Sequence, residues 1–250
     1  MVDLNGKRAL VTGASRGLGA RVAIELARHG AEVLLNYRNN NQGAREIQRQ
    51  IQSVGGSAIT LPANLVDPSA IKEMFQVIEK EGGLDILVHG AILGSFKSVI
   101  ALRANQWDLT MNTGARALLL CAKEAARLME GQGGKIVGIS SLGSHRVMPS
   151  YGAIGVTKAA LEALIRYLAV ELGPKGISVN GVAAGAIDSP TLHQHPNGKE
   201  LLARARLKSP SGKLVTESEI ADVVLFLCSP LANSVQGQTI VADSGMSLVL

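Results

Sequence analysis

The sequence predicts a single α/β domain, in which a doubly wound parallel sheet of about seven strands carries helices on both faces. Three observations predict this fold. The chain of 250 residues is 46% hydrophobic, which is ample for one large core. Short apolar runs rich in β-formers alternate with longer helical patterns from one end to the other, as crossover helices between parallel strands require. A glycine-rich turn joins the first strand to the first helix.

The expected elements follow one another in regular alternation along the chain. The strand candidates are Ala9–Thr12, Glu32–Asn36, Ala58–Leu61, Ile86–His89, Lys135–Ser140, Ser178–Val182 and Thr239–Ala242. The helical stretches are Leu18–His29, Asn41–Val54, Ser69–Glu81, Ala104–Met129, Tyr151–Leu172 and Glu217–Ser229.

Several helix ends have local causes in the sequence. Thr216 followed by Glu219 forms a capping box that can start the last helix. Asp67–Pro68 is a plausible helix entry, and Gly173–Pro174 ends the long helix that begins at Tyr151. No internal repeat, low-complexity tract or linker interrupts the chain, so residues 1–250 are expected to form one catalytic domain.

The segment 187–212 differs from the rest of the chain. It is polar, contains three prolines, and shows only weak helical patterning around Lys199–Leu207. A long irregular insertion in a compact domain is usually a lid or a disordered loop, and we expect a substrate lid here.

Composition excludes several classes of protein. No apolar run approaches the roughly 18 residues that a membrane helix needs. The N-terminus has an acidic residue, Asp3, and enters a strand almost at once, which is unlike a signal peptide. We therefore expect a cytoplasmic protein without a membrane partner. The two cysteines, Cys121 and Cys228, lie in apolar helical stretches, so buried free thiols are expected, with neither disulfide framework nor metal site.

The formal charge of +5 and the pI of about 9.4 favour acidic partners. Aromatic residues make up only 3% of the chain and no basic run is interleaved with rings, so a nucleic-acid stacking platform is not expected. A phosphorylated cofactor, an acidic carrier protein and a merely basic solvated surface remain open.

The first strand runs directly into a candidate phosphate-binding turn. The turn reads Thr12-Gly13-Ala14-Ser15-Arg16-Gly17-Leu18-Gly19. Its three glycines allow a tight turn and a close approach of the backbone to a pyrophosphate, which the following helix N-terminus would bind. Its position between the first strand and the first helix makes this signal specific, and it predicts a dinucleotide cofactor.

The end of the second strand bears on which dinucleotide binds. An enzyme that prefers NAD usually has a carboxylate there to bind the ribose 2′-hydroxyl. This chain has none in residues 34–39, and Arg38 together with Arg16 could instead flank a 2′-phosphate. We expect NADPH as the cofactor, with NADH possible.

A second constellation lies on one helix face. Tyr151 and Lys158 are seven residues apart, which is about 20° short of two helical turns and about 10 Å along the axis. A lysine ammonium near a phenol lowers the pKa of the tyrosine, which could then act as a proton donor or oxyanion stabiliser near neutral pH.

These residues resemble those of the short-chain dehydrogenase/reductase superfamily along the whole chain. Thr12–Gly19 is similar to its cofactor motif, and Asn112 to its structural and catalytic asparagine. Ser140–Ser141 is similar to the serine-bearing strand end, and Ala184–Gly185 falls where the family usually has Pro-Gly. The common Tyr-x-x-x-Lys motif is broken, because Ile154 stands four residues before the lysine.

A smaller branch, the enoyl-acyl-carrier-protein reductases, uses Tyr-x₆-Lys, and the likeness is closest to its type III family. The stretches most alike are 140–144, 155–172, 185–189 and 237–243. The resemblance implies reduction of trans-2-enoyl thioesters on acyl carrier protein in fatty acid elongation, typically with NADPH, by a tetramer.

The same resemblance implies roles for individual residues. Catalytic roles fall to Tyr151, Lys158, Ser141, Ser144 and Asn112, and cofactor contacts to Gly13, Ser15, Arg16, Gly17, Leu18, Gly19, Arg38, Asn64, Leu65, His89, Gly90, Lys158, Gly185 and Ile187.

The chain departs from the family pattern at several positions. His89-Gly90 stands where many members have Asn-Asn, so His89 is interpreted as a structural substitute that lines the cofactor. Asn64 replaces an aspartate that contacts adenine in most members, and Val147 replaces a second tyrosine of the type III reductases.

The shifted tyrosine agrees with enoyl reduction on physical grounds. In ketone reduction, hydride adds to the carbon that bears the oxygen to be protonated. In enoyl thioester reduction, hydride adds at C3 while negative charge develops on the oxygen attached to C1, so the donor must lie elsewhere. Two alternatives remain open: a carbonyl reductase acting on 3-oxoacyl thioesters, sugars or sterols, and a non-catalytic cofactor-sensing protein.

Overall fold

The computed structural model describes residues 2–249, and within them the chain forms one parallel sheet of seven strands in the order β3-β2-β1-β4-β5-β6-β7. The chain winds outward from β1 to β3, crosses back to β4, and winds outward again to β7, which confirms the predicted doubly wound sheet. The strands are β1 (Arg8–Thr12), β2 (Glu32–Tyr37), β3 (Ser57–Pro62), β4 (Ile86–His89), β5 (Gly134–Ser141), β6 (Ile177–Ala184) and β7 (Thr239–Ala242).

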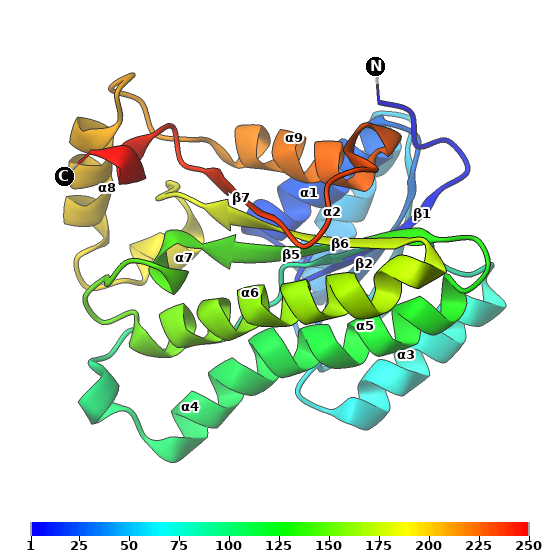
Figure 1. The fold of residues 1–250 in the computed structure, drawn as a ribbon, viewed down its shortest axis with the longest axis horizontal. Helices are drawn as coiled ribbons and strands as arrows, with labels where there is room; N and C mark the ends of the chain where they lie inside the picture. Colours follow the sequence, from blue (N-terminus) through cyan, green and yellow to red (C-terminus); the bar gives the residue numbers. More distant parts are fainter. Residues whose placement is uncertain (1, 250) are drawn as a thin grey trace.

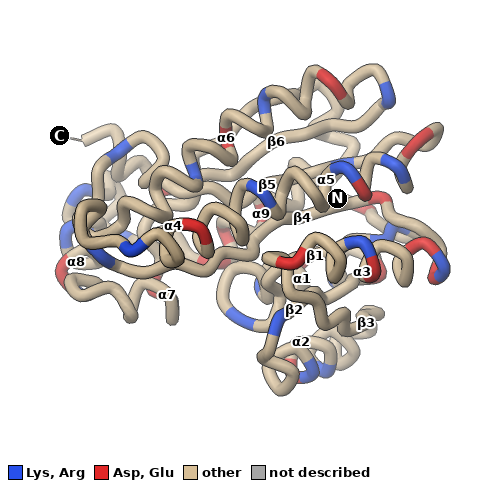
Figure 2. Tube along the Cα trace, turned by 90° about the horizontal axis from the view of Figure 1, so that it is seen from below, with Lys and Arg blue, Asp and Glu red and all other residues tan. Residues whose placement is uncertain are grey.

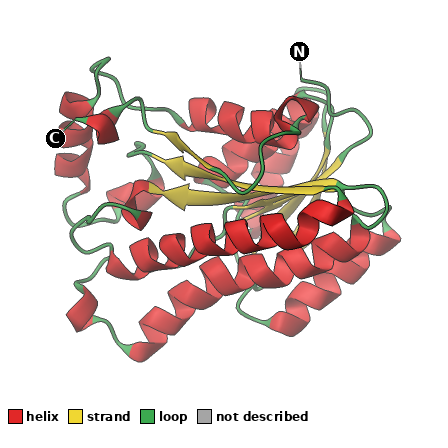
Figure 3. Cartoon of the chain, viewed as in Figure 1, coloured by secondary structure: helices red, strands yellow, loops and turns green. Residues whose placement is uncertain are grey.

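Helices cover both faces of the sheet, as Figures 1 and 3 show. One face carries α1, α2 and α9, and the other carries α3, α5 and α6. The short helices α7 and α8 lie beyond the carboxyl ends of the strands, beside the C-terminus (Figure 1). The α-helices are α1 (Gly17–Arg28), α2 (Asn41–Ser53), α3 (Pro68–Lys80), α4 (Ala104–Met111), α5 (Ala117–Leu128), α6 (Gly152–Leu172), α7 (Pro190–His193), α8 (Gly198–Lys208) and α9 (Glu217–Cys228).

The core consists of two hydrophobic layers separated by the sheet. Successive strand residues point to opposite faces, so Val11 and Val33 pack beneath α1 and α9 while Leu10 and Leu34 pack against α3 and α5. All four side chains are buried, because a parallel sheet covered on both faces leaves neither side of a strand in water.

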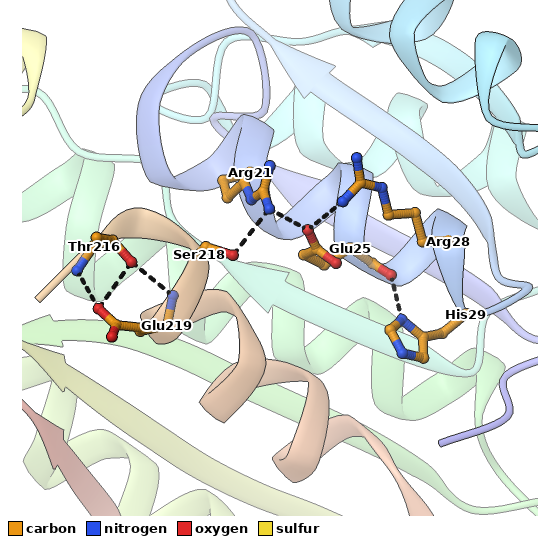
Figure 4. Close-up of polar contacts among 7 residues, drawn as sticks. All are labelled: Arg21, Glu25, Arg28, His29, Thr216, Ser218 and Glu219. Atoms are coloured by element: carbon orange, nitrogen blue, oxygen red, sulfur yellow. Dashed lines mark hydrogen bonds and ion pairs between the residues drawn. The ribbon is translucent and has the colours of Figure 1, made fainter. Parts of the chain in front are cut away.

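The expected helix entries are confirmed. The Asp67 side chain accepts a hydrogen bond from the Ser69 backbone N–H at 2.8 Å and begins α3. Thr216 and Glu219 form the capping box of α9, and Arg21 of α1 donates to the Ser218 hydroxyl at 2.9 Å, which joins the two neighbouring helices (Figure 4).

One expectation is refined and another is corrected. The predicted stretch 104–129 is helical over residues 104–128, but the Ala117 N–H bonds to the Asn112 carbonyl five residues back, which opens a π-turn over Asn112–Arg116 between α4 and α5. The segment 187–212 is not irregular: it contains α7 and α8, and the Ser189 side chain accepts from the Leu192 N–H to begin α7.

Within residues 2–249, no helix is long and apolar enough to cross a membrane. No group of three or more His, Cys, Asp or Glu side chains in that range is arranged to hold a metal ion. Cys121 and Cys228 are buried free thiols, as predicted.

Candidate active site

A cavity of about 860 Å³ opens at the carboxyl ends of the strands. It runs from the glycine turn after β1, past the ends of β4, β5 and β6, to helices α7 and α8. This is the point where the strand order reverses, and it is where ligands bind in doubly wound sheets. Of the predicted site residues, it brings together Gly13, Ser15, Arg16, Gly17, Leu18, Gly19, Arg38, Asn64, Leu65, Gly90, Ser141, Tyr151, Lys158, Gly185 and Ile187.

The glycine turn forms a concave backbone surface, a cradle in which there is no room for side chains in place of its glycines. Gly13 has φ +71°, and a Cβ there would lie 2.9 Å from Ala91 Cα. A Cβ on Gly19 would lie 2.5 Å from the Gly13 carbonyl oxygen. The N-terminus of α1 has no side-chain cap, so no side chain occupies the N–H groups of its first turn. These features fit a pyrophosphate group at the helix N-terminus.

Two cations lie at the far end of this cradle. Arg16 and Arg38 both line the cavity and are exposed, and neither guanidinium has a hydrogen bond or ion pair within the described part of the chain. Nearby, Asn64 accepts from the Val66 N–H at 3.3 Å, and Leu65 is buried. The residues present therefore fit an adenosine that carries a 2′-phosphate.

The serine and the tyrosine meet on the opposite wall. The Tyr151 hydroxyl lies 3.4 Å from Ser141 Oγ, which also accepts from the Gly143 N–H at 3.2 Å. The Phe96 ring stacks on Tyr151 with centroids 6.1 Å apart. Burial raises the pKa of Tyr151, and its hydrogen bond to Ser141 lowers that pKa only in part, so the phenol keeps its proton near neutral pH.

Lys158 is buried in the same wall, and its Nζ donates to the Ile139 carbonyl at 2.6 Å. Burial lowers the pKa of Lys158 from its ordinary 10.5 to about 8, while the Glu162 carboxylate acts in the opposite direction. The expectation that Lys158 lowers the pKa of Tyr151 is therefore wrong for this structure. The ammonium is bonded to a strand carbonyl, and desolvation dominates the tyrosine.

Three predicted site residues do not line the cavity. Ser144 lies one turn behind Ser141, with its Oγ 2.6 Å from Glu162 Oε1 and 2.7 Å from the Ser141 carbonyl. Asn112 begins the π-turn and is half-buried, whereas the following residue, Thr113, lines the cavity.

His89 is the third, and it is fully buried behind the cavity wall. Its Nε2 donates to the Gly114 carbonyl at 3.1 Å, so Nδ1 accepts from the Thr12 hydroxyl at 3.0 Å. Burial lowers the pKa of His89 to about 3, and the neighbouring Lys158 charge acts in the same direction. The ring is neutral and fastens β4 to the π-turn. Its position behind the wall does not support the prediction that His89 contacts the cofactor.

Helices α7 and α8 form the remaining wall with the C-terminal residues. Leu192, Leu201 and Met246 supply apolar surface, and Arg204 and Lys208 add charge. His195 fastens this wall: its Nε2 donates to the Pro149 carbonyl at 2.7 Å, and its Nδ1 accepts from the Asn197 N–H at 3.0 Å.

Sequence reasoning missed three residues around the reactive pair: Phe96, Glu162 and His195. Glu162 carried a usable signal, because it follows Lys158 by one helical turn on the same face. Phe96 and His195 lie in segments without periodicity, and no pattern points to their contact at 5.0 Å between ring centroids.

The fold and this site together define a dinucleotide-binding enzyme of the doubly wound class. Comparison with known proteins narrows the class further. The family model described as enoyl-(acyl carrier protein) reductase matches residues 13–247. A 1-cyclohexenylcarbonyl-CoA reductase of Streptomyces collinus is 36% identical over 244 residues, which cover 96% of this chain and 87% of that protein.

Other relatives carry different names. A versicolorin reductase of Emericella nidulans is 35% identical, covering 97% of this chain and 96% of that protein. An NADH-dependent enoyl-acyl-carrier-protein reductase of Synechocystis sp. is 31% identical, covering 100% and 99%. Among solved structures, a short-chain dehydrogenase from Burkholderia cenocepacia in complex with NADP has a TM-score of 0.89 and 34% identity, covering 98% and 99%.

The chain belongs to the short-chain dehydrogenase/reductase family. It is an oxidoreductase with an NAD(P)-binding reductase fold, and NAD(P)H is its cofactor.

Proposed function

We propose that this protein is an NADPH-dependent reductase of the C2–C3 double bond of trans-2-enoyl thioesters, in the form of enoyl-acyl-carrier-protein. The observation that carries the proposal is the position of the phenol. Tyr151 lines the cavity beside Ser141, whereas Ile154, four residues before Lys158, is buried outside it. A Cβ on Gly94 would lie 2.6 Å from Ile154 Cγ1, so the Ile154 side chain packs directly against the backbone at Gly94.

The residues of the wall suit charge that develops on a thioester oxygen. NADPH supplies the hydride that adds to C3. Tyr151 keeps its proton near neutral pH and can donate it to the enolate oxygen. Ser141 already accepts from the Gly143 N–H, so its own hydroxyl proton is available for the same oxygen. Lys158, with Gly185 and Ile187, would hold the nicotinamide end.

The choice of NADPH over NADH rests on Arg16 and Arg38. Both guanidinium groups lie at the adenosine end without a partner among residues 2–249, and no carboxylate stands at the end of β2 to bind a free 2′-hydroxyl.

The carrier would approach over α8. Figure 2 shows Lys and Arg positions clustered on this helix, and the residues are Lys199, Arg204, Arg206 and Lys208. Two of them, Arg204 and Lys208, also line the cavity, where they can meet the phosphate of a carrier arm or an acidic carrier protein. Segment 187–212 would act as a lid that excludes water, in an enzyme of fatty acid elongation in the cytoplasm.

The outer face of α5 and α6 supports a homo-oligomer, which we propose to be a tetramer. Leu119, Tyr167 and Val170 are exposed there, with Tyr167 at 71% and Val170 at 77% of their full accessible surface. Exposed large apolar side chains on two helices of the same sheet face support an interface at that face.

A panel of substrates tests this proposal. The purified protein is incubated with crotonyl and acetoacetyl thioesters, each with NADPH and with NADH, and cofactor absorbance is followed. We expect turnover of the crotonyl thioester with NADPH. Preferential turnover of the acetoacetyl thioester would favour the carbonyl reductase that the versicolorin reductase relative suggests. Tight NADPH binding with no turnover would favour a non-catalytic cofactor-binding protein.

The variant Tyr151→Phe tests the assigned acid. Enoyl reduction should fall by about 100-fold or more, because the proton donor is lost, while NADPH binding stays near that of the wild type. Retention of most activity would show that another group donates the proton.

A further inference from the structure

A buried carboxylate lies directly behind the reactive wall. Glu162 is one helical turn after Lys158 on α6, and its side chain is only 3% exposed. A glutamate in such a position is costly unless it is hydrogen-bonded, because burial removes the water that would solvate its charge. The partners of Glu162 therefore indicate what the residue does.

Among residues 2–249, the hydrogen-bonding partners of Glu162 lie at the end of β5 and just after it. Oε1 accepts hydrogen bonds from the hydroxyls of Ser140 and Ser144, the latter at 2.6 Å. Oε2 lies 2.7 Å from Nε2 of His145, whose side chain is 59% exposed. Glu162 thus fastens the turn of residues 140–145 to α6. We name this segment the serine turn.

The serine turn carries the groups that face the substrate. Ser141, between the two serines that bond to Glu162, places its Oγ 3.4 Å from the Tyr151 hydroxyl. The carbonyl of Ile139, just before the turn, holds Lys158 Nζ. We infer that Glu162 is a positioning residue, which fixes Ser141 against Tyr151 and places a carboxylate one helical turn from Lys158, without touching substrate or cofactor itself. This inference rests on the proposed function only in the part that concerns turnover of an enoyl thioester.

The effect of Glu162 on the pKa of Lys158 has a definite direction. Lys158 is faced by Glu162 from its own helix and by the neutral His89 from β4. The Glu162 carboxylate raises the pKa of Lys158 against the effect of burial, so removing that charge moves the pKa of Lys158 below about 8. Lys158 would then lose its proton at a lower pH.

Two substitutions separate the roles of shape and charge. Glu162→Gln keeps the length of the side chain and removes the charge, whereas Glu162→Asp keeps the charge and withdraws the oxygens from the serine turn. Glu171→Gln is the matched control, because Glu171 is an exposed glutamate at the other end of α6. We measure kcat and KM for the crotonyl thioester, and the NADPH dissociation constant by fluorescence, across pH for each protein.

We expect Glu162→Gln to move the alkaline limb of both kcat/KM and NADPH binding to lower pH, and Glu162→Asp to leave that limb in place. Both variants should lose kcat on the order of 10-fold with little change in KM, because Ser141 is displaced. Glu171→Gln should match the wild type. A merely structural glutamate would lower the melting temperature without moving the alkaline limb.

Wild-type kcat and an unmoved alkaline limb in Glu162→Gln would overturn the inference. If that variant does not fold, Ser144→Ala removes one hydrogen bond to Glu162 and leaves the charge. It should lower kcat with the limb in place, and unchanged kcat in both Ser144→Ala and Glu162→Asp would overturn the inference equally. If the wild type reduces no enoyl thioester, the proposed function fails, and the pH dependence of NADPH binding still tests Glu162.

Discussion

At the scale of single residues, the active site contains a buried charge, the Lys158 ammonium, whose burial is unfavourable. Lys158 is 4% exposed, and within the part of the chain that the structure describes its ammonium has one hydrogen-bond partner, the Ile139 carbonyl. The difference between a pKa of 10.5 and one of about 8 corresponds to roughly 3 kcal/mol of unfavourable burial. A residue kept at such a cost is typical of a functional site rather than of a structural core.

This cost predicts the effect of Lys158→Met. The variant should lose activity, yet unfold at a higher temperature, with a gain of roughly 1–3 kcal/mol near pH 7, because an apolar side chain replaces a buried charge. Glu162 keeps its serine and histidine partners in the variant, so it is not left without hydrogen bonds. Scanning calorimetry of both proteins measures the difference.

The gain in Lys158→Met should depend on pH with a known sign. Between about pH 8 and 10.5 the unfolded wild type holds a proton that the folded wild type has released, so rising pH stabilises the wild type. The advantage of the variant is therefore largest below about pH 8 and shrinks toward pH 10. An advantage that stays constant across this range would contradict a depressed pKa at this lysine.

Residue chemistry also limits what the sequence could predict about the site. The glycine turn was predictable from its motif between the first strand and the first helix, and the Tyr151–Lys158 pair from a spacing that puts two residues on one helix face. The roles of His89 and Ser144 were not, because their partners Gly114 and Glu162 come from other elements. Direct contact with the cavity depends on which way a side chain points, and one sequence does not encode that in any local pattern.

At the scale of elements, the approach of α6 to the serine turn depends on glycine. A Cβ on Gly143 would lie 2.6 Å from Cε1 of Tyr151, and one on Gly155 would lie 2.7 Å from the Gly143 carbonyl. The N-terminal turn of α6 and the serine turn therefore meet backbone to backbone, and this close contact holds the phenol at the cavity wall.

Gly143→Ala tests this contact. We expect the added methyl group to displace the Tyr151 ring and to lower kcat by about 100-fold, with NADPH affinity near that of the wild type. Gly173→Ala is the matched control, because a Cβ there would meet only the end of the Gln236 side chain at 3.4 Å. Unchanged kcat in Gly143→Ala would show that catalysis tolerates a displaced Tyr151 ring.

The wall formed by α7 and α8 depends on one buried histidine. His195→Ala removes hydrogen bonds to Pro149 and Asn197, together with the edge contact to Phe96. We expect KM for the acyl thioester to rise about 10-fold, since two buried hydrogen bonds contribute roughly 1–3 kcal/mol, while the NADPH dissociation constant changes little. His193→Ala is the control, because His193 pairs with Asp188 at the surface. A wild-type KM in His195→Ala would show that this histidine does not hold the wall of α7 and α8.

Element prediction succeeded where periodicity and capping agree and failed where tertiary contacts decide. All seven strands were predictable from short apolar runs, and α9 from its capping box. The π-turn at Asn112–Arg116 was not, because the Gly114 carbonyl bonds to a buried ring on β4 and the Gly114 Cα lies against Thr157, where a Cβ would be 2.3 Å from the Thr157 methyl carbon. Helix α8 has only a weak apolar stripe in the sequence. In the structure it lines the cavity together with the C-terminal residues, and this tertiary position stabilises the helix.

At the scale of the whole molecule, the sheet divides the protein into two hydrophobic layers that share strands β1 to β6. Cys121 on α5 lies in one layer and Cys228 on α9 in the other. Burial raises the pKa of each thiol to about 12, so neither is a reactive thiolate near neutral pH. The two cysteines are therefore natural reporters of how the two layers open.

The shared sheet predicts that both layers open together. In Cys121→Ala and Cys228→Ala, the one remaining thiol should react slowly with an aromatic disulfide reagent in native buffer. The free energy of opening obtained from its rate should equal that of global unfolding in each variant, because neither layer can separate without exposing the strands that both use. Rates are measured across a denaturant series and referred to each variant's own unfolding curve, which corrects for the cavity that the substitution leaves. Labelling of Cys228 at a denaturant concentration where Cys121 stays protected would show instead that α9 detaches from the sheet as a separate unit.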